Sequence, residues 1–256
     1  MRRAGYGRGV SLGVVFLPDT ALLVPGAGGA ADPADGLRAV ALDALGAVDA
    51  GERVHVVAPG RRTRVLPHPV GLGLGAAGLD VAHLGVVGEN PVVPSAHRAD
   101  VAASTALVLL RAAGVPGPVD VVELTRTATG HAPPPRPAAD VGLLVVVGSL
   151  SARHGPDAPL ADDPRAAAAD AALIAALGSG PVALADALDA LGADGAHELA
   201  VSAAGPWRAV LRLIPDGAVE VSALHAEVLA GAQHAVAAWT VTAPSTAPST
   251  APEEPR

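Results

Sequence analysis

The chain has 256 residues and a formal net charge of −8, with 50% hydrophobic but only 2% aromatic residues. It contains no cysteine, which excludes disulfides, thiolate metal sites and a cysteine nucleophile. The acidic balance, with arginines scattered except in the run 61–64, argues against a nucleic-acid-binding surface. A chain of this length fits one α/β domain whose core is built from Val, Leu and Ala.

The first 30 residues place arginines before an apolar run, as a signal peptide does, but Pro18 and Asp19 interrupt that run. Nowhere do 18 apolar residues follow one another, so we expect no membrane-spanning segment. We predict a cytoplasmic protein, with secretion as the alternative. We expect an N-terminal extension over 1–9, one domain over 10–241 and a disordered tail over 242–256, where S-T-A-P repeats.

Apolar runs typical of strands alternate along the domain with segments whose apolar residues recur at helical spacing. Strands are predicted over 10–16, 53–58, 119–124 and 141–147, and helices over 33–51, 95–113 and 163–177. Two or three short helices are expected between 181 and 214, followed by strands over 218–223 and 235–241. Alternating strands and helices predict an α/β three-layer sandwich, with a largely parallel central sheet and helices on both faces.

The segment after the fourth predicted strand carries a family pattern. "GSLSARHGPDAPLADDPR" supplies Gly148, Leu150 and Ser151, then P-D-A-P and D-P-R, with Asp170 in the helix that follows. The opening strand leads to "LPDTALLVPG", and "AGPWRAVLRL" lies further along. These motifs resemble the class III extradiol ring-cleavage dioxygenase (LigB-like) superfamily. The resemblance implies its α/β sandwich fold and, in active members, an Fe(II) site of two histidines and a glutamate.

The chain departs from that pattern at the positions that matter for iron. Asp19 stands where the family has the histidine of P-H-P-P, while Ser149 and Ala152 replace the acid and the histidine of G-D-L-S-H. The second ligand usually follows the second strand, where this chain reads "APGRRTR". We therefore expect a degenerate metal site, no cofactor, and a non-catalytic or small-molecule-binding role.

The alternative is a metal-dependent dioxygenase with a rebuilt Fe(II) site. Asp19, His68 and His154 are the candidate ligands, with His68 and His154 also the catalytic candidates and with Glu89 or Glu123 as helpers. Each candidate also has a structural interpretation. Asp19 could bond the backbone of a turn, and His68 and His131 could be histidines of proline-rich loops. His154 could be solvated, and His55 could belong to a sheet face.

Other groups suggest ligands or partners. Arg61, Arg62 and Arg64 could hold the carboxylate or phosphate of a small anionic ligand, or could be a solvated loop. Ser149 and Ser151 near His154 invite a serine-hydrolase interpretation, but the chain lacks G-x-S-x-G there. The resemblance leaves an aromatic ligand and a homo-oligomer as further expectations. The predicted ligand-binding residues are thus Asp19, Arg61, Arg62, Ser149 and Ser151.

Overall fold

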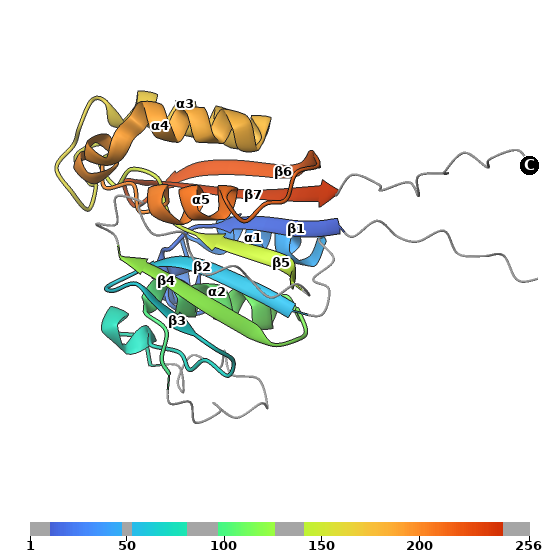
Figure 1. Cartoon of the computed structure of the whole chain (residues 1–256). Helices are drawn as coiled ribbons and strands as arrows, with labels where there is room; N and C mark the ends of the chain where they lie inside the picture. Colours follow the sequence, from blue (N-terminus) through green and yellow to red (C-terminus); the bar gives the residue numbers. More distant parts are fainter. Residues whose placement is uncertain (1–10, 48–52, 81–96, 126–140, 243–256) are drawn as a thin grey trace, which may run out of the picture.

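The computed structural model describes residues 11–47, 53–80, 97–125 and 141–242 (Figure 1). These residues form a seven-stranded sheet in the order β3-β4-β2-β5-β1-β7-β6, with helices on both faces. The predicted three-layer α/β architecture is therefore observed. The proposed N-terminal extension and C-terminal tail lie almost wholly outside the described residues, as do Glu89 and His131.

The sheet is mixed rather than largely parallel, which corrects the prediction. Its four central strands are parallel to one another: β4 (Val119–Thr125), β2 (Arg53–Gly60), β5 (Val141–Val147) and β1 (Ser11–Leu17). Antiparallel strands lie outside them, namely β3 (Arg64–Leu66) on β4, and the hairpin β6 (Ala218–Leu229) and β7 (Ala232–Thr242) on β1. A tight turn can join only antiparallel strands, so the closing hairpin makes that side antiparallel.

The helices divide between the two faces of the sheet (Figure 1). One face carries α1 (Asp35–Ala47) and α2 (Val101–Ala112). The other carries α3 (Ala166–Ser179), α4 (Pro181–Glu198) and α5 (Ala204–Leu211). Short 3-10 turns complete the described elements: η1 (Ala21–Leu23), η2 (Gly29–Ala31) and η3 (Leu74–Ala77).

Successive side chains of a strand point to opposite faces of the sheet, and they fill the two cores that lie there. In β1, Val15 and Leu17 face α1 and α2, whereas Val14 and Phe16 face α3 to α5. The chain's single phenylalanine packs against both of its tryptophans, with ring centroids 5.6 Å from Trp207 and 4.6 Å from Trp239. Its few bulky aromatic rings thus stabilise one core together, and the other is built from aliphatic side chains.

The β6–β7 hairpin extends well beyond the two short strands predicted here. Its turn places Ala230 at φ 50° and Gly231 at φ 71°. The two central residues of such left-handed turns are usually Asn-Gly or Asp-Gly, whereas here they are Ala-Gly. Strand pairing over Ala218–Leu229 holds Ala230 in a conformation that is unfavourable for alanine. The dipeptide Ala-Gly does not predict this conformation. Among the described helices, none is both long and apolar enough to cross a lipid bilayer.

Candidate functional site at the carboxyl edge of the sheet

The carboxyl ends of the four parallel strands lie along one edge of the sheet. After β1 and β2 the chain turns to the face of α1 and α2, whereas after β5, which lies between them, it turns to the opposite face. Diverging connections of this kind open the crevices in which α/β proteins bind ligands. Asp19, Arg61 and Ser149 follow these three strands, so the three residues lie at the same edge of the sheet.

Ser149 joins three segments at this edge. The backbone N–H of Asp19 donates to its Oγ at 3.1 Å, and Nδ1 of His234 on β7 lies 3.0 Å from the same oxygen. The backbone N–H of Ser149 donates to Oγ of Ser202 at 2.8 Å. The hydroxyl therefore links β7 to the loop that follows β1.

His234 is the functional-site residue that sequence reasoning missed. Burial lowers its pKa, while the charges of Asp19 and Glu227 oppose that shift. A neutral imidazole can accept the Ser149 hydroxyl proton through Nδ1, which matches the contact observed. Because "AQHAV" resembles any buried strand, only the tertiary contact identifies this residue.

Ser151 and His154 both contact a buried carboxylate, that of Asp170 on α3. The N–H of Ser151 donates to both Asp170 oxygens, at 3.1 and 3.2 Å, and Nε2 of His154 lies 2.6 Å from Oδ2. Burial raises the pKa of Asp170, against the opposing effects of His154 and the Ser151 amide. His154 is therefore neither a solvated loop histidine nor turned toward Asp19. The Ser151 hydroxyl is buried and has no hydrogen-bond partner among the described residues.

His68 lies at the opposite edge of the sheet. Its N–H donates to Asp120 at 3.0 Å, and its Nδ1 accepts from the N–H of Val119 at 3.4 Å, both at the amino end of β4. Asp19 and His154 instead follow the carboxyl ends of β1 and β5. The rebuilt metal site of Asp19, His68 and His154 is thus contradicted, because these three side chains do not share one cleft.

The donor set at the carboxyl edge does not fit Fe(II). Within the described ranges, no group of three or more histidine, aspartate or glutamate side chains is placed to hold a metal ion. Near Ser149 the edge offers one carboxylate, Asp19, and one imidazole, whose Nδ1 already faces the serine. The facial site of the family needs two imidazoles and a carboxylate. The other described imidazole that follows these strand ends, His154, contacts Asp170 instead.

A serine-hydrolase site is also unsupported at Ser149. An oxyanion hole needs backbone N–H groups that are aimed at the reacting oxygen. Here the four N–H groups of residues 148–151 all donate to internal acceptors: Leu17 O, Ser202 Oγ, Gln233 O and the Asp170 carboxylate. The Ser149–His234 contact is therefore a structural link between β5 and β7.

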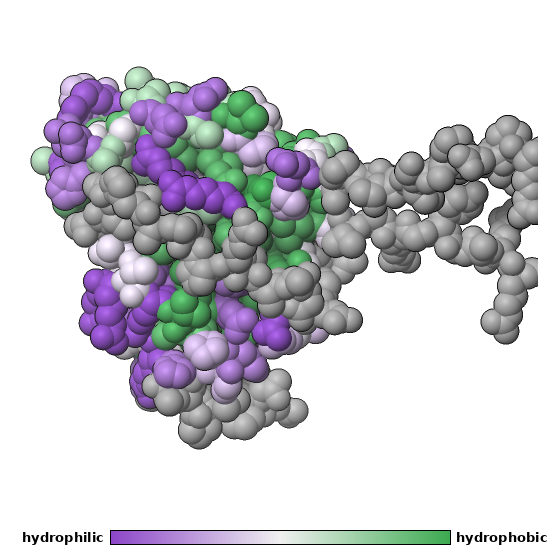
Figure 2. All heavy atoms as spheres, in the orientation of Figure 1, coloured by the Kyte–Doolittle hydropathy of each residue, from purple (hydrophilic) through white to green (hydrophobic). Residues whose placement is uncertain are grey.

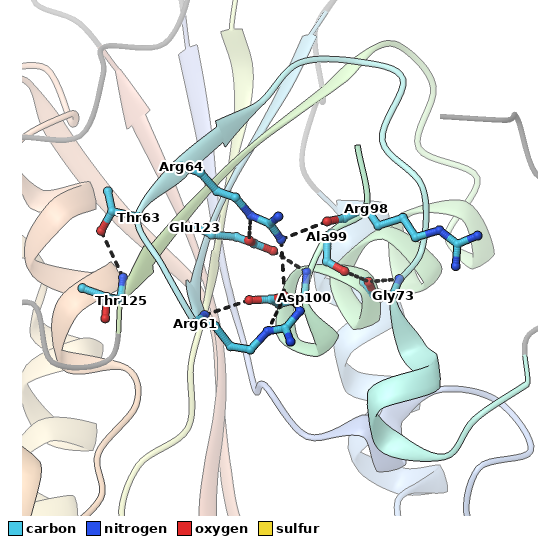
Figure 3. A network of polar contacts seen from close by, with 10 residues as sticks. Arg61, Thr63, Arg64, Gly73, Arg98, Ala99, Asp100, Glu123 and Thr125 are labelled. Atoms are coloured by element: carbon cyan, nitrogen blue, oxygen red, sulfur yellow. Dashed lines mark hydrogen bonds and ion pairs between the residues drawn. The ribbon is translucent and has the colours of Figure 1, made fainter. Parts of the chain in front are cut away.

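The arginine run forms a network with two acids (Figure 3). Arg61 donates to Asp100 through its backbone N–H at 2.7 Å and through its guanidinium at 3.0 and 3.1 Å. Nε of Arg64 donates to the fully buried Glu123 at 2.5 Å, and the N–H of Asp100 donates to the other Glu123 oxygen. Burial alone would raise the pKa of Asp100. The hydrogen bonds from Arg61 and the positive charges of Arg61 and Arg64 outweigh burial, so the pKa is lowered.

This network surrounds a pocket of about 350 Å³ lined by Arg61, Arg62, Arg64 and Asp100. Figure 2 shows hydrophilic side chains gathered at this end of the sheet, near the end of β4. Arg61 is 84% exposed at its side chain, whereas Arg64 is 20% exposed and fixed by Glu123. Of the described acidic residues, none forms an ion pair with Arg62, so the pocket keeps an arginine that is available to a ligand.

Comparison with protein-family models and with curated protein sequences gives no match for this chain. The resemblance to extradiol dioxygenases therefore rests on the motifs quoted above.

Proposed function

We propose that this protein is an extradiol-dioxygenase-like α/β domain that has lost the iron site and binds a small anionic molecule in the pocket of Arg61, Arg62 and Arg64. The observation that carries the proposal is the position of this pocket, because three arginines line it at the carboxyl ends of β2 and β4. That is the edge at which α/β sheets bind ligands.

The balance of charge supports an anionic ligand. Three guanidinium groups face two carboxylates, those of Asp100 and Glu123, which leaves one net positive charge. The buried Glu123 holds Arg64 in place, so part of the ordering cost of binding is met before a ligand arrives. Arg61 and Arg62 then present N–H donors in the planar arrangement that suits carboxylate or phosphate oxygens.

Thermal unfolding in the presence of phosphate or citrate tests this function. At constant ionic strength, each anion should raise the Tm of the wild type above its value in chloride, because binding to the folded state stabilises it. The double variant Arg61→Ala, Arg62→Ala should lose this rise. Arg111→Ala, at the exposed far end of α2, removes one positive charge away from the pocket and should keep the rise in Tm. Equal stabilisation in the double variant would contradict the proposal.

A further inference from the structure

A second cavity lies on the other face of the same strand ends. It has a volume of about 220 Å³ and lies between Pro59 and Leu124, at the ends of β2 and β4, and the α4–α5 region. Its polar lining comes from Thr125, Asp194, His197, Ser202 and Arg208, and the rest of its wall is mostly apolar. An apolar hollow with a few convergent polar groups is the usual form of a small-molecule site. The volume lies below the roughly 300–1,000 Å³ typical of drug-sized ligands, so it fits a small metabolite.

The sequence builds one wall of this cavity with a break in α4. Gly192 has φ 68° and ψ 176° inside the helix, a conformation that glycine adopts without strain. The segment after the break supplies Asp194 and His197 to the cavity. Across the cavity, Ser202 and the start of α5 are fixed to β5, because Ser202 Oγ and the N–H of Ala203 both bond to the Ser149 backbone.

Opposite charges line the cavity. The Arg208 guanidinium donates to the carbonyl oxygen of Leu188 and lies 3.7 Å from Asp189, whose side chain is 83% exposed. Because this contact is long and Asp189 is exposed to solvent, the pair contributes little, and Arg208 retains donors for a carboxylate. Asp194 is an exposed carboxylate that can accept hydrogen bonds from an ammonium group. His197 stands on the same piece of α4 as Asp194.

We propose that this cavity binds a small zwitterion of the α-amino-acid class. Arg208 holds its carboxylate, Asp194 holds its ammonium group, and the apolar wall around Pro59 and Leu124 takes its side chain. A ligand lacking either charge leaves one of these groups unpaired. This site is independent of the arginine pocket, which lies on the face of α2.

A thermal-shift panel of the twenty standard amino acids, followed by calorimetric titration of the tightest binder, tests the inference. The proposal expects saturable binding of at least one amino acid. The des-amino acid and the decarboxylated amine made from that same ligand should each bind at least tenfold more weakly. If no amino acid binds saturably, or if the des-amino acid binds as tightly, the proposal is overturned.

Point variants test whether the amino acid binds in this cavity. Asp194→Asn, an exposed change that should leave the fold intact, should weaken amino-acid binding at least tenfold and leave binding of the des-amino acid unchanged. Asp186→Asn, an exposed change earlier in α4, is the matched control and should bind normally. The double variant Arg61→Ala, Arg62→Ala should also bind the amino acid normally, which separates this inference from the proposed anion site. Undiminished binding in Asp194→Asn would overturn it.

Discussion

The Ser149 hydroxyl oxygen lies 3.0 Å from Nδ1 of His234 and joins the end of β5 to β7 across the intervening strand β1. The same oxygen accepts the N–H of Asp19, which follows β1. Three strands are thus tied by one side chain at the carboxyl edge of the sheet.

Two neighbouring serines should respond oppositely to truncation. Ser149→Ala removes the acceptor of the Asp19 N–H and the hydroxyl that contacts Nδ1 of the buried His234, and should lower the free energy of unfolding by about 1–3 kcal/mol. Ser151→Ala removes a buried hydroxyl that has no partner among the described residues, and should be neutral or stabilising. Urea denaturation of both variants measures the contrast. Equal losses would contradict the structural role assigned to Ser149.

Gly148 allows α5 to approach the end of β5. A Cβ atom at this position would lie 2.4 Å from the Cα of Ala203, so Gly148→Ala must displace the start of α5. We expect a loss of about 2–3 kcal/mol in the free energy of unfolding. Gly36→Ala in α1 is the matched control, since nothing lies within 4 Å of the added atom. It should stabilise the protein by about 0.5–1 kcal/mol, as alanine does in helices.

Glu123 should be essential to the arginine network. Glu123→Ala leaves the Arg64 guanidinium and the Asp100 N–H without their buried acceptor, which should cost about 3 kcal/mol. Glu220→Ala, an exposed site on edge strand β6, should change stability by less than about 0.5 kcal/mol. Chemical denaturation checks both values. A small effect at Glu123 would mean that Arg64 is not held by this carboxylate.

Stability should fall as the pH drops below about 6.5. Burial lowers the folded-state pKa of His234 and of His55 below the ordinary value of about 6.5, so the unfolded chain binds protons there that the folded chain does not. Each histidine contributes a slope of at most about 1.4 kcal/mol per pH unit. His234→Gln should reduce this slope without abolishing it, since His55 remains.

Asp170 acts in the opposite sense. Its raised pKa gives stability that is lost as the pH rises from 3.8 through its folded value. Because Asp170 is present in both proteins, the difference between wild type and His234→Gln in unfolding free energy, measured from about pH 5.5 to 7.5, isolates the contribution of His234. An unchanged slope in His234→Gln would contradict the neutral, buried state of this imidazole.

The sequence predicts the parallel strands well because each is a short apolar run with a clear end. The expected strand 141–147 is observed as Val141–Val147, and 119–124 differs by one residue. Helix 163–177 begins later than predicted, at Ala166, because Asp163 bonds Arg165 in a turn before it. The mixed sheet was missed because the Ala230-Gly231 turn carries no familiar signal.

The site was only partly accessible to sequence reasoning. Asp19 and Ser149 were singled out from the motifs at the ends of two predicted strands, and both strands are observed there. His68 was misplaced because its position depends on β3 running antiparallel at the sheet margin. His234 and Asp170 act through contacts with residues distant in the chain, and local sequence does not encode those pairings.

Iron retention tests the central claim most directly. The purified full chain is incubated anaerobically with Fe(II), dialysed, and analysed for iron per chain. Because Ser149, His234 and Asp19 bond one another and no second imidazole joins them in the described edge, the account predicts no retained iron above a buffer control. Retention of one iron per chain, lost in His234→Gln, would show that this edge is a metal centre and would contradict the account.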